Sequence, residues 1–211
     1  MDKLALYQGA CAVIGVRKVM SLTEDRLSRR ELDGVFDRGG IRSCLRRGQW
    51  NFSIRTVRLD SSPSIEPDFG YQYAFDKPTD WVRTVGMASD EYFTSPLTRY
   101  EDESGYWYAG ADPLYVRFVS DDVLYGMDYS KWTDDFARYA EAWFGLQVHD
   151  RLVNNAEKKE LLKKDVKRLL LEGKSSDAMD EPTRFPPAGS WSSARGSRSR
   201  GERGSRSRLI G

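Results

Sequence analysis

Apolar residues recur at helical spacing in the first part of the chain. Between residues 3 and 15 they return every three to four positions, and Gly15 is placed to end the helix. Ser21 followed by Glu24 has the pattern of a capping box, in which a hydroxyl and a carboxylate satisfy each other's backbone donors. Gly39-Gly40 should then kink the helix that follows, because glycine disfavours a helix interior. The pattern predicts helices over residues 3–48.

The same spacing returns near the other end of the chain. Ser130 is a suitable N-cap for a helix with an aromatic and apolar face. Asn154 with Glu157 then predicts the start of a leucine-bearing helix. Two helices joined by about three residues form an antiparallel hairpin. The second helical region should span residues 131–173.

Between these regions the apolar period changes from helical to two. Alternation over residues 52–59, 81–88 and 114–119 predicts strands. Residues 106–108 should pair with residues 97–101 across the acidic turn 102–105, forming a projecting hairpin. We therefore predict an α+β fold. A helical bundle built from both chain ends, within a body of residues 1–181, carries an inserted antiparallel β-rich region over residues 51–129.

Residues 182–211 differ in composition from the rest of the chain and are predicted to form an extended basic C-terminal arm. The pentapeptide GSRSR occurs twice, at 196–200 and 204–208, and so little apolar content cannot support a fold. This arm holds seven Arg and one Glu, a net charge of +6. Since the whole chain carries +1, the body carries about −5. The arm could dock on an acidic protein, neutralise phosphates of a nucleic acid, or remain a solvated tail.

Composition indicates the compartment in which the protein folds and the kind of surface it carries. Cys11 and Cys44, the two cysteines, fall within apolar helical patterns and are expected to be buried free thiols, which fits folding in a reducing compartment. Aromatic residues make up 12% of the chain, and such an excess of large amphipathic rings suggests an oligomer interface. No signal peptide and no run of eighteen apolar residues occurs, so a soluble protein without a membrane partner is expected.

Candidate catalytic groups are few. None of the common nucleotide-binding, hydrolase or zinc motifs is present, and His149 is expected to be a partly exposed helical residue. The acidic groups at 101–103, 121–122 and 134–135 could pair for hydrolysis or hold a metal, but turn and first-turn acids usually face solvent or serve a helix dipole. We expect no enzyme activity, no catalytic residue, no cofactor and no metal site.

Several sequence segments occur together in a distinctive order. They are SLTED at 21–25, LRRGQWNF at 45–52, PSIEP at 63–67, GYQYAFDKP at 70–78, DWVR at 80–83, GYWY at 105–108, YVRFV at 115–119 and PPAGSW at 186–191. Together they resemble the tail tubular protein A family, the head-to-tail adaptors of T7-like short-tailed phages. The resemblance runs from the N-terminus to about Trp191, and its specificity lies in the number and order of the segments.

That resemblance implies a structural virion protein of the tail or neck, made in the host cytoplasm. Its subunits would form a dodecameric ring beneath the portal protein, with genomic DNA passing through the channel without sequence-specific binding. The further partners would be the tail nozzle protein (tail tubular protein B) and tail fibres. An acidic lumen would repel DNA and let it slide.

The resemblance also suggests which residues bind. The arm is expected to dock on the portal, with its aromatic residues as anchors and its arginines paired with carboxylates; the candidates are Arg184, Phe185, Trp191, Arg195, Arg198, Arg200, Arg203, Arg206 and Arg208. The hairpin is the candidate contact for the nozzle or fibres, through Arg99, Tyr100, Tyr106, Trp107 and Tyr108.

Two other functions stay open at this stage. A nucleic-acid-binding protein could use the Arg/Ser/Gly arm to coat DNA or RNA, with binding that weakens steeply with salt. A tail-associated cell-wall hydrolase acting through Asp or Glu is a more distant alternative.

Overall fold

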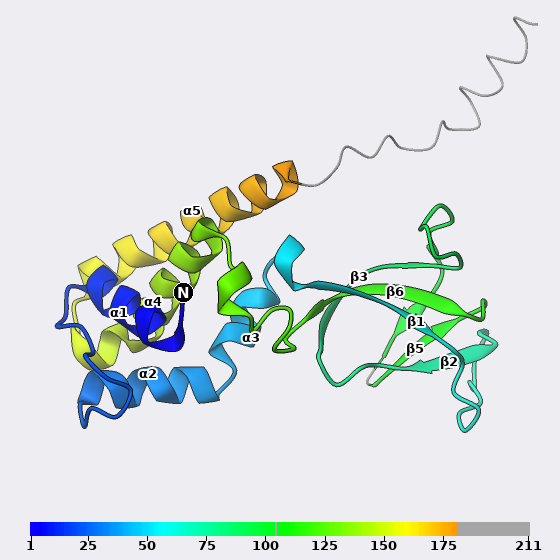
Figure 1. Cartoon of the computed structure of the whole chain (residues 1–211), viewed down its shortest axis with the longest axis horizontal. Coiled ribbons are helices and arrows are strands. Elements are labelled where there is room, and N and C mark those ends of the chain that lie inside the picture. Colours follow the sequence, from blue (N-terminus) through cyan, green and yellow to red (C-terminus); the bar gives the residue numbers. More distant parts are fainter. Residues whose placement is uncertain (104, 181–211) are drawn as a thin grey trace, which may run out of the picture. The chain divides into compact units, whose positions relative to one another are not determined.

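The computed structural model describes residues 1–103 and 105–180, and within them the fold is α+β (Figure 1). The described residues form five α-helices, two short 3₁₀ turns and two small antiparallel sheets. The expected α+β class is therefore confirmed. The arm predicted at 182–211 lies outside the described residues.

Helices α1 (Lys3–Ile14), α2 (Leu27–Asp37) and α3 (Gly40–Leu45) form the first helical region. The Asp2 carboxylate caps α1 by accepting from the Ala5 N–H at 2.7 Å, and Gly15 ends it with a left-handed φ of 73°. Gly39, at φ 79°, separates α2 from α3, so the predicted break is confirmed. These positive φ values are accessible to glycine without the steric cost that a Cβ atom would add.

The predicted capping box at Ser21 and Glu24 is wrong. The Ser21 hydroxyl accepts from the Thr23 N–H at 3.2 Å, and the Glu24 carboxylate accepts from the Met20 N–H at 2.9 Å. These bonds close a local turn, and α2 begins only at Leu27. Short polar side chains compete with helix formation in this way by bonding to nearby backbone.

Helices α4 (Asp134–Leu152) and α5 (Ala156–Met179) form the second helical region. Thr133 rather than Ser130 caps α4, accepting from the Phe136 N–H at 3.3 Å. Ser130 instead lies in the 3₁₀ turn η2 (Tyr129–Lys131), which the Asp128 side chain caps. The three-residue link between α4 and α5 is as predicted, but Asn155 provides the cap and α5 extends past residue 173.

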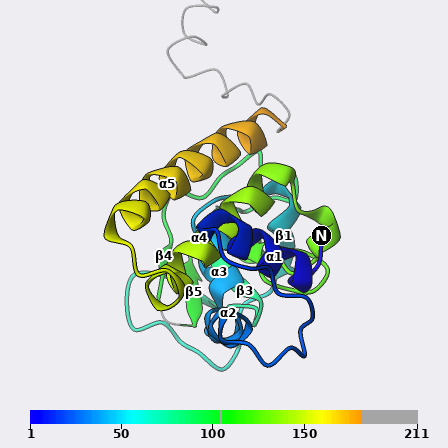
Figure 2. The same cartoon turned by 90° about the vertical axis from the view of Figure 1, so that its left-hand side faces the viewer.

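Helix α4 lies at the centre of the helical packing, in contact with α1, α2, α3 and α5. Its buried face contributes Phe136, Tyr139 and Phe144, which are fully buried with Leu6 and Tyr7 of α1. Figure 2 shows α1 in front of this group, with α5 and α2 on different sides of it. Burial of these large side chains supplies most of the drive to bring together helices from both chain ends.

The β-rich region contains two three-stranded sheets with the orders β1-β6-β3 and β2-β5-β4. The strands are β1 (Ile54–Leu59), β2 (Tyr73–Asp76), β3 (Trp81–Ala88), β4 (Glu101–Asp102), β5 (Tyr106–Ala109) and β6 (Leu114–Ser120). The predicted strand at 81–88 is confirmed. Residues 106–108 pair only with the two-residue strand β4, not with all of residues 97–101. Leu97 lies beside β3 instead, where its N–H donates to the Met87 carbonyl at 2.9 Å.

Strand β6 connects the two hydrophobic cores. Leu114, Val116 and Phe118 point into the core of the β-rich region. Val119, on the opposite face of the strand, is fully buried in the helical core instead. The alternation of a strand thus lets one element pack against both parts of the chain.

The end of α5 is fastened to the start of the β-rich region. The Asp177 carboxylate, 7% exposed, accepts from the Asn51 backbone N–H at 3.1 Å through each oxygen. In return, the Asn51 side-chain amide donates to the Asp177 carbonyl at 2.7 Å. These contacts link residues that are 126 positions apart in the sequence.

We predict that Asp177→Ala lowers the free energy of unfolding by about 1–3 kcal/mol, because the Asn51 N–H would lose its acceptor in a partly buried position. Asp180→Ala is the matched control on the exposed last residue beyond α5 and should change stability by less than about 0.5 kcal/mol. Urea denaturation followed by circular dichroism measures both. Equal stability of the two variants would contradict a fastening role.

Candidate functional site

The predicted portal-binding residues, from Arg184 to Arg208, lie outside the described residues. The structure does describe the helix that leads to them. Gly173 packs against the Trp50 ring, where an added Cβ would come within 3.3 Å of it, and Asp177 holds Asn51 one turn later. The point at which the chain leaves α5 for the arm is therefore held by tertiary contacts.

The predicted hairpin contact divides into an inner and an outer face. In β5, Trp107 and Ala109 are fully buried, whereas Tyr106 and Tyr108 are only half-buried. Successive side chains of a strand point to opposite faces, so the Trp107 ring belongs to the β core. Including Trp107 in the contact surface is wrong, and the tyrosines on either side remain candidates.

Two residues outside the hairpin extend its outer face. The Phe69 ring lies 4.9 Å from the Tyr108 ring and 5.8 Å from the Tyr71 ring, measured between centroids. The Tyr106 and Tyr108 rings are 6.4 Å apart. We call these four residues, Phe69, Tyr71, Tyr106 and Tyr108, the aromatic face. Phe69 is 41% exposed, so the group presents apolar surface to solvent.

Sequence patterns did not identify Phe69 and Tyr71 as part of this face. Both lie in a loop punctuated by proline and glycine, and only the folded chain brings that loop to β5. Arg99 is exposed, and Tyr100 packs against the β core. Within the described residues, no ring contact joins Tyr100 to the aromatic face.

A polar network fixes the hairpin behind the aromatic face. The Lys77 ammonium, 7% exposed, donates to the Asp102 carboxylate and lies 4.1 Å from the centre of the Trp81 ring. The same carboxylate accepts from the Thr84 hydroxyl at 2.7 Å and from the Trp107 indole N–H at 3.2 Å. The network therefore joins β3, β4 and β5 and sets the orientation of the outward tyrosines.

The environment of Asp102 favours its charged form. Burial alone would raise the pKa of Asp102, but hydrogen bonds from Lys77 and Thr84 and the nearby Lys77 charge hold that pKa below its ordinary value. A carboxylate stabilised in this way contributes to folding only while it is ionised.

The acidic groups weighed as catalysts make structural contacts. Asp121 forms an ion pair with Arg42, and Asp122 accepts from the Leu124 N–H at 2.8 Å within a turn. Asp134 and Asp135 occupy the first turn of α4, where a carboxylate interacts favourably with the helix dipole. No cluster of three or more His, Cys, Asp or Glu suited to a metal exists in residues 1–103 and 105–180.

The cysteines and the histidine are all buried. Cys11 and Cys44 are free thiols, as predicted, and burial raises the pKa of each, which disfavours the nucleophilic thiolate. The expectation of a partly exposed His149 is wrong, because its side chain is 1% exposed. It faces inward because α4 is covered along that side by α5 and α1.

Comparison with protein-family models and with curated proteins found no significant match to the chain. None of the helices within the described residues combines the length and apolar character needed to cross a membrane.

We predict that Asp102→Asn lowers the free energy of unfolding by about 1–3 kcal/mol at neutral pH, because the buried Lys77 charge loses its partner. Since the pKa of Asp102 is lowered in the folded state, its contribution is present above the unfolded value, about 4, and is lost as pH falls through the folded value.

The difference between the wild type and Asp102→Asn should therefore shrink in acid. Urea denaturation at a series of pH values measures this difference. Glu101→Gln, on the neighbouring exposed residue, is the control and should match the wild type at neutral pH. A difference that stays constant down to low pH would contradict the ionised network.

Proposed function

We propose that the protein is a non-enzymatic structural component of a short-tailed phage virion. It would be the subunit of an adaptor ring that joins the portal to the tail nozzle and forms part of the DNA ejection channel. The observation that carries this proposal is the contrast in charge between an acidic body, about −5 over residues 1–181, and a segment of +6 over residues 182–211. The ordered sequence segments that resemble the tail tubular protein A family supply the identity of the partner.

The arm is the proposed attachment to the portal. Seven arginines among small residues suit carboxylates on an acidic protein surface, since guanidinium groups form charge-assisted, often bidentate bonds. Each arm need bind only weakly, because a ring engages many copies at once and the contacts act together.

The aromatic face is the proposed contact with the nozzle protein or tail fibres. Tyr and Phe rings bury large areas at little cost in conformational entropy, and they are enriched at binding hot spots. The Lys77–Asp102 network holds the strand that carries Tyr106 and Tyr108, so the surface is largely ordered before binding.

The charge of the body suits a conduit for DNA. Residues 1–181 carry about −5, although α5 is locally basic. A surface of the same sign as the phosphate backbone weakens non-specific binding and favours passage.

We predict that deleting residues 182–211 leaves a folded body that no longer co-sediments with purified portal. Changing the seven arm arginines to glutamine should abolish attachment as well, whereas changing them to lysine should retain part of it, because lysine keeps the charge but not the planar fork. Portal attachment by the truncated chain at the wild-type level would remove the arm from the mechanism.

The same variants separate this proposal from a nucleic-acid-binding function. A DNA-coating protein would bind duplex or single-stranded DNA at low salt through its arm, and portal would not compete. The adaptor proposal expects portal attachment to exceed DNA binding at moderate salt. Arm-dependent DNA binding with no portal attachment would favour the alternative.

We predict that Tyr108→Ala weakens binding to the nozzle protein by at least about tenfold, or about 1.4 kcal/mol, because the ring is central to the aromatic face. Tyr92→Ala is the control, since Tyr92 is 79% exposed and lies outside the aromatic face. Surface plasmon resonance with immobilised nozzle protein measures both. Equal loss in the two variants would argue against a defined face.

A further inference from the structure

The outer face of the sheet β2-β5-β4 places carboxylates beside the tyrosine rings. The register of β2 and β5 sets Asp76 opposite Tyr106. The register of β4 and β5 sets Glu101 opposite Tyr108. Glu103 exchanges both backbone hydrogen bonds with Tyr106, at 3.1 and 3.4 Å, so it also lies opposite that residue. Residues opposite each other in antiparallel strands share a face, with Cβ atoms about 5 Å apart, so each tyrosine has a carboxylate as its neighbour.

These three carboxylates are not matched by a cation. Asp76, Glu101 and Glu103 are exposed, and their side chains form no ion pair or hydrogen bond in the part of the chain that the structure describes. The surrounding sequence is acidic as well: residues 60–76 hold four Asp or Glu, residues 100–112 hold four more, and neither segment holds Lys or Arg. The outer face therefore carries a local excess of negative charge beside its rings.

The inner face of the same sheet shows what such an arrangement binds. Asp102 of β4 lies opposite Trp107 of β5. The Lys77 ammonium pairs with Asp102 and lies 4.1 Å from the centre of the Trp81 ring and 5.7 Å from that of Trp107. The cation is stabilised by the carboxylate charge and by the electron-rich ring faces together. One residue further along each strand, the outer face repeats the carboxylate and the ring without the cation.

A guanidinium group fits the outer face better than an ammonium group does. It is planar, so it can stack on a tyrosine ring while its N–H groups donate to the neighbouring carboxylate. It is also less strongly hydrated than an ammonium, so leaving water costs it less. The β-rich region already contains a stacked guanidinium, that of Arg117, 4.6 Å from the centre of the Phe93 ring.

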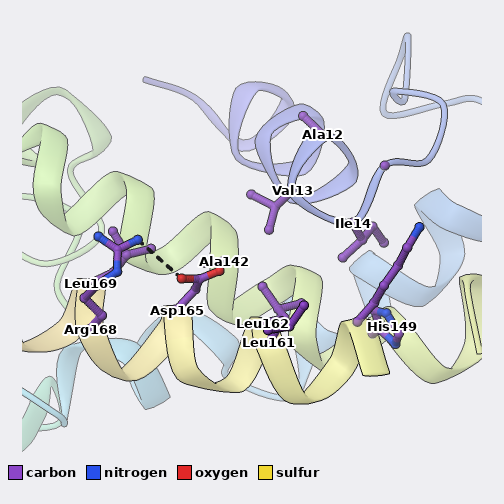
Figure 3. A pocket seen from close by; sticks show the side chains of 12 residues that line it. Ala12, Val13, Ile14, Ala142, His149, Leu161, Leu162, Asp165, Arg168 and Leu169 are labelled. Atoms are coloured by element: carbon purple, nitrogen blue, oxygen red, sulfur yellow. Dashed lines mark hydrogen bonds and ion pairs between the residues drawn. The ribbon is translucent and has the colours of Figure 1, made fainter. Parts of the chain in front are cut away.

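The groove lined by α1, α4 and α5 is not an equivalent site for a cation. Its lining is mainly apolar, and the acid that lines it, Asp165, already pairs with Arg168 at 3.3 Å (Figure 3). Lys158 lines the groove as well, so an incoming guanidinium would meet a like charge. Charge complementarity thus directs a cationic partner to the outer face of the sheet.

We propose that this outer face binds arginine side chains of the partner protein. One guanidinium stacks on Tyr106 and pairs with Asp76 and Glu103, and a second stacks on Tyr108 and pairs with Glu101. The two rings are 6.4 Å apart, which matches the spacing of about 7 Å between alternate side chains of an extended segment. This inference rests on the proposed docking of the nozzle protein or tail fibres, and it names the chemistry that the partner presents: two arginines separated by one residue in an extended segment.

Peptide binding to the full chain provides the first test. The probe is a dye-labelled Arg-Thr-Arg-Thr-Arg-Thr peptide, and fluorescence anisotropy at physiological ionic strength measures its affinity. It should bind at least about fivefold more tightly than the peptide with lysine in place of arginine, because lysine keeps the charge without the planar fork. The peptide with citrulline, which has nearly the same shape but no charge, should not bind. A citrulline peptide that binds as tightly as the arginine peptide would overturn the proposal.

Variants of the carboxylates locate the binding. Asp76→Asn/Glu101→Gln should weaken binding of the arginine peptide at least about tenfold, since each guanidinium loses a charged partner. Glu91→Gln/Glu157→Gln is the matched control, because it changes the net charge equally at exposed residues outside the sheet, and it should weaken binding less than about twofold. Equal losses in the two double variants would show only long-range attraction and would overturn the proposal.

Variants of one tyrosine test the stacking. Tyr106→Leu keeps an apolar side chain but removes the ring face, and it should weaken binding at least about fivefold. Tyr106→Phe keeps the ring and should bind the arginine peptide as the wild type does. Circular dichroism melting of both variants checks that they are folded. Equal affinities of two folded variants would contradict stacking of the guanidinium on the ring.

Binding to the nozzle protein separates this inference from the proposed function. Loss of nozzle binding in Tyr108→Ala with full binding in Asp76→Asn/Glu101→Gln would reject the arginine partner and leave the aromatic face as the contact. Treating the nozzle protein with phenylglyoxal, which blocks arginine side chains, should abolish binding, and undiminished binding would likewise reject the inference. Attachment to the portal is measured separately, so the adaptor function stands or falls on that result.

Discussion

The burial of Trp50 is the contact on which the arrangement of the described residues depends. Its ring lies 4.8 Å from the Phe136 ring and 6.1 Å from the Tyr139 ring, both on α4, and it packs against Gly173 of α5. The β-rich region begins only four residues later, at Ile54. One side chain thus contacts the central helix α4 and the last helix α5, close to the start of the first strand. An added Cβ at position 173 would lie 3.3 Å from the ring, closer than ordinary van der Waals contact, so the glycine suits this tight packing.

The same constraint connects the fold with the proposed attachment. Trp50 and Asn51 hold the last turns of α5, so the described part of the chain ends at a fixed place on the body. A binding segment is more effective when its origin is fixed near its target, since the anchored end raises the effective concentration of the rest.

Local patterns predicted those elements whose boundaries depend on local chemistry. The ends of α1 and of β3, the break before Gly40 and the three-residue link after α4 all follow from glycine, caps or alternation. The errors arose where two equally good local signals competed. Ser130 and Thr133 are both suitable caps, and the choice fell to Thr133 because Asp128 captures the Ser130 N–H and hydroxyl.

The candidate site was harder to predict than the fold, because its residues meet only through tertiary packing. The alternation of strand side chains places Tyr106 and Tyr108 on the opposite face from Trp107. No sequence pattern near Phe69 indicates that its ring contacts Tyr108. The burial of His149 depends on α1 and α5 covering α4, which a single helix pattern does not encode.

Charge was visible in the sequence, but its distribution in the fold explains more than the net value. Many acids of the body are used internally: Asp33 accepts from Tyr7 and Arg29, and Asp80 accepts from Arg55 and Ser120. The cations of α5 are mostly exposed, so they form a basic side on an otherwise acidic body. Around the loop after β6, Asp121 pairs with Arg42 and Asp128 pairs with Lys131 in the same way. Because so many carboxylates are matched by a cation within the fold, the net charge overstates the acidity of the surface that the body presents to solvent.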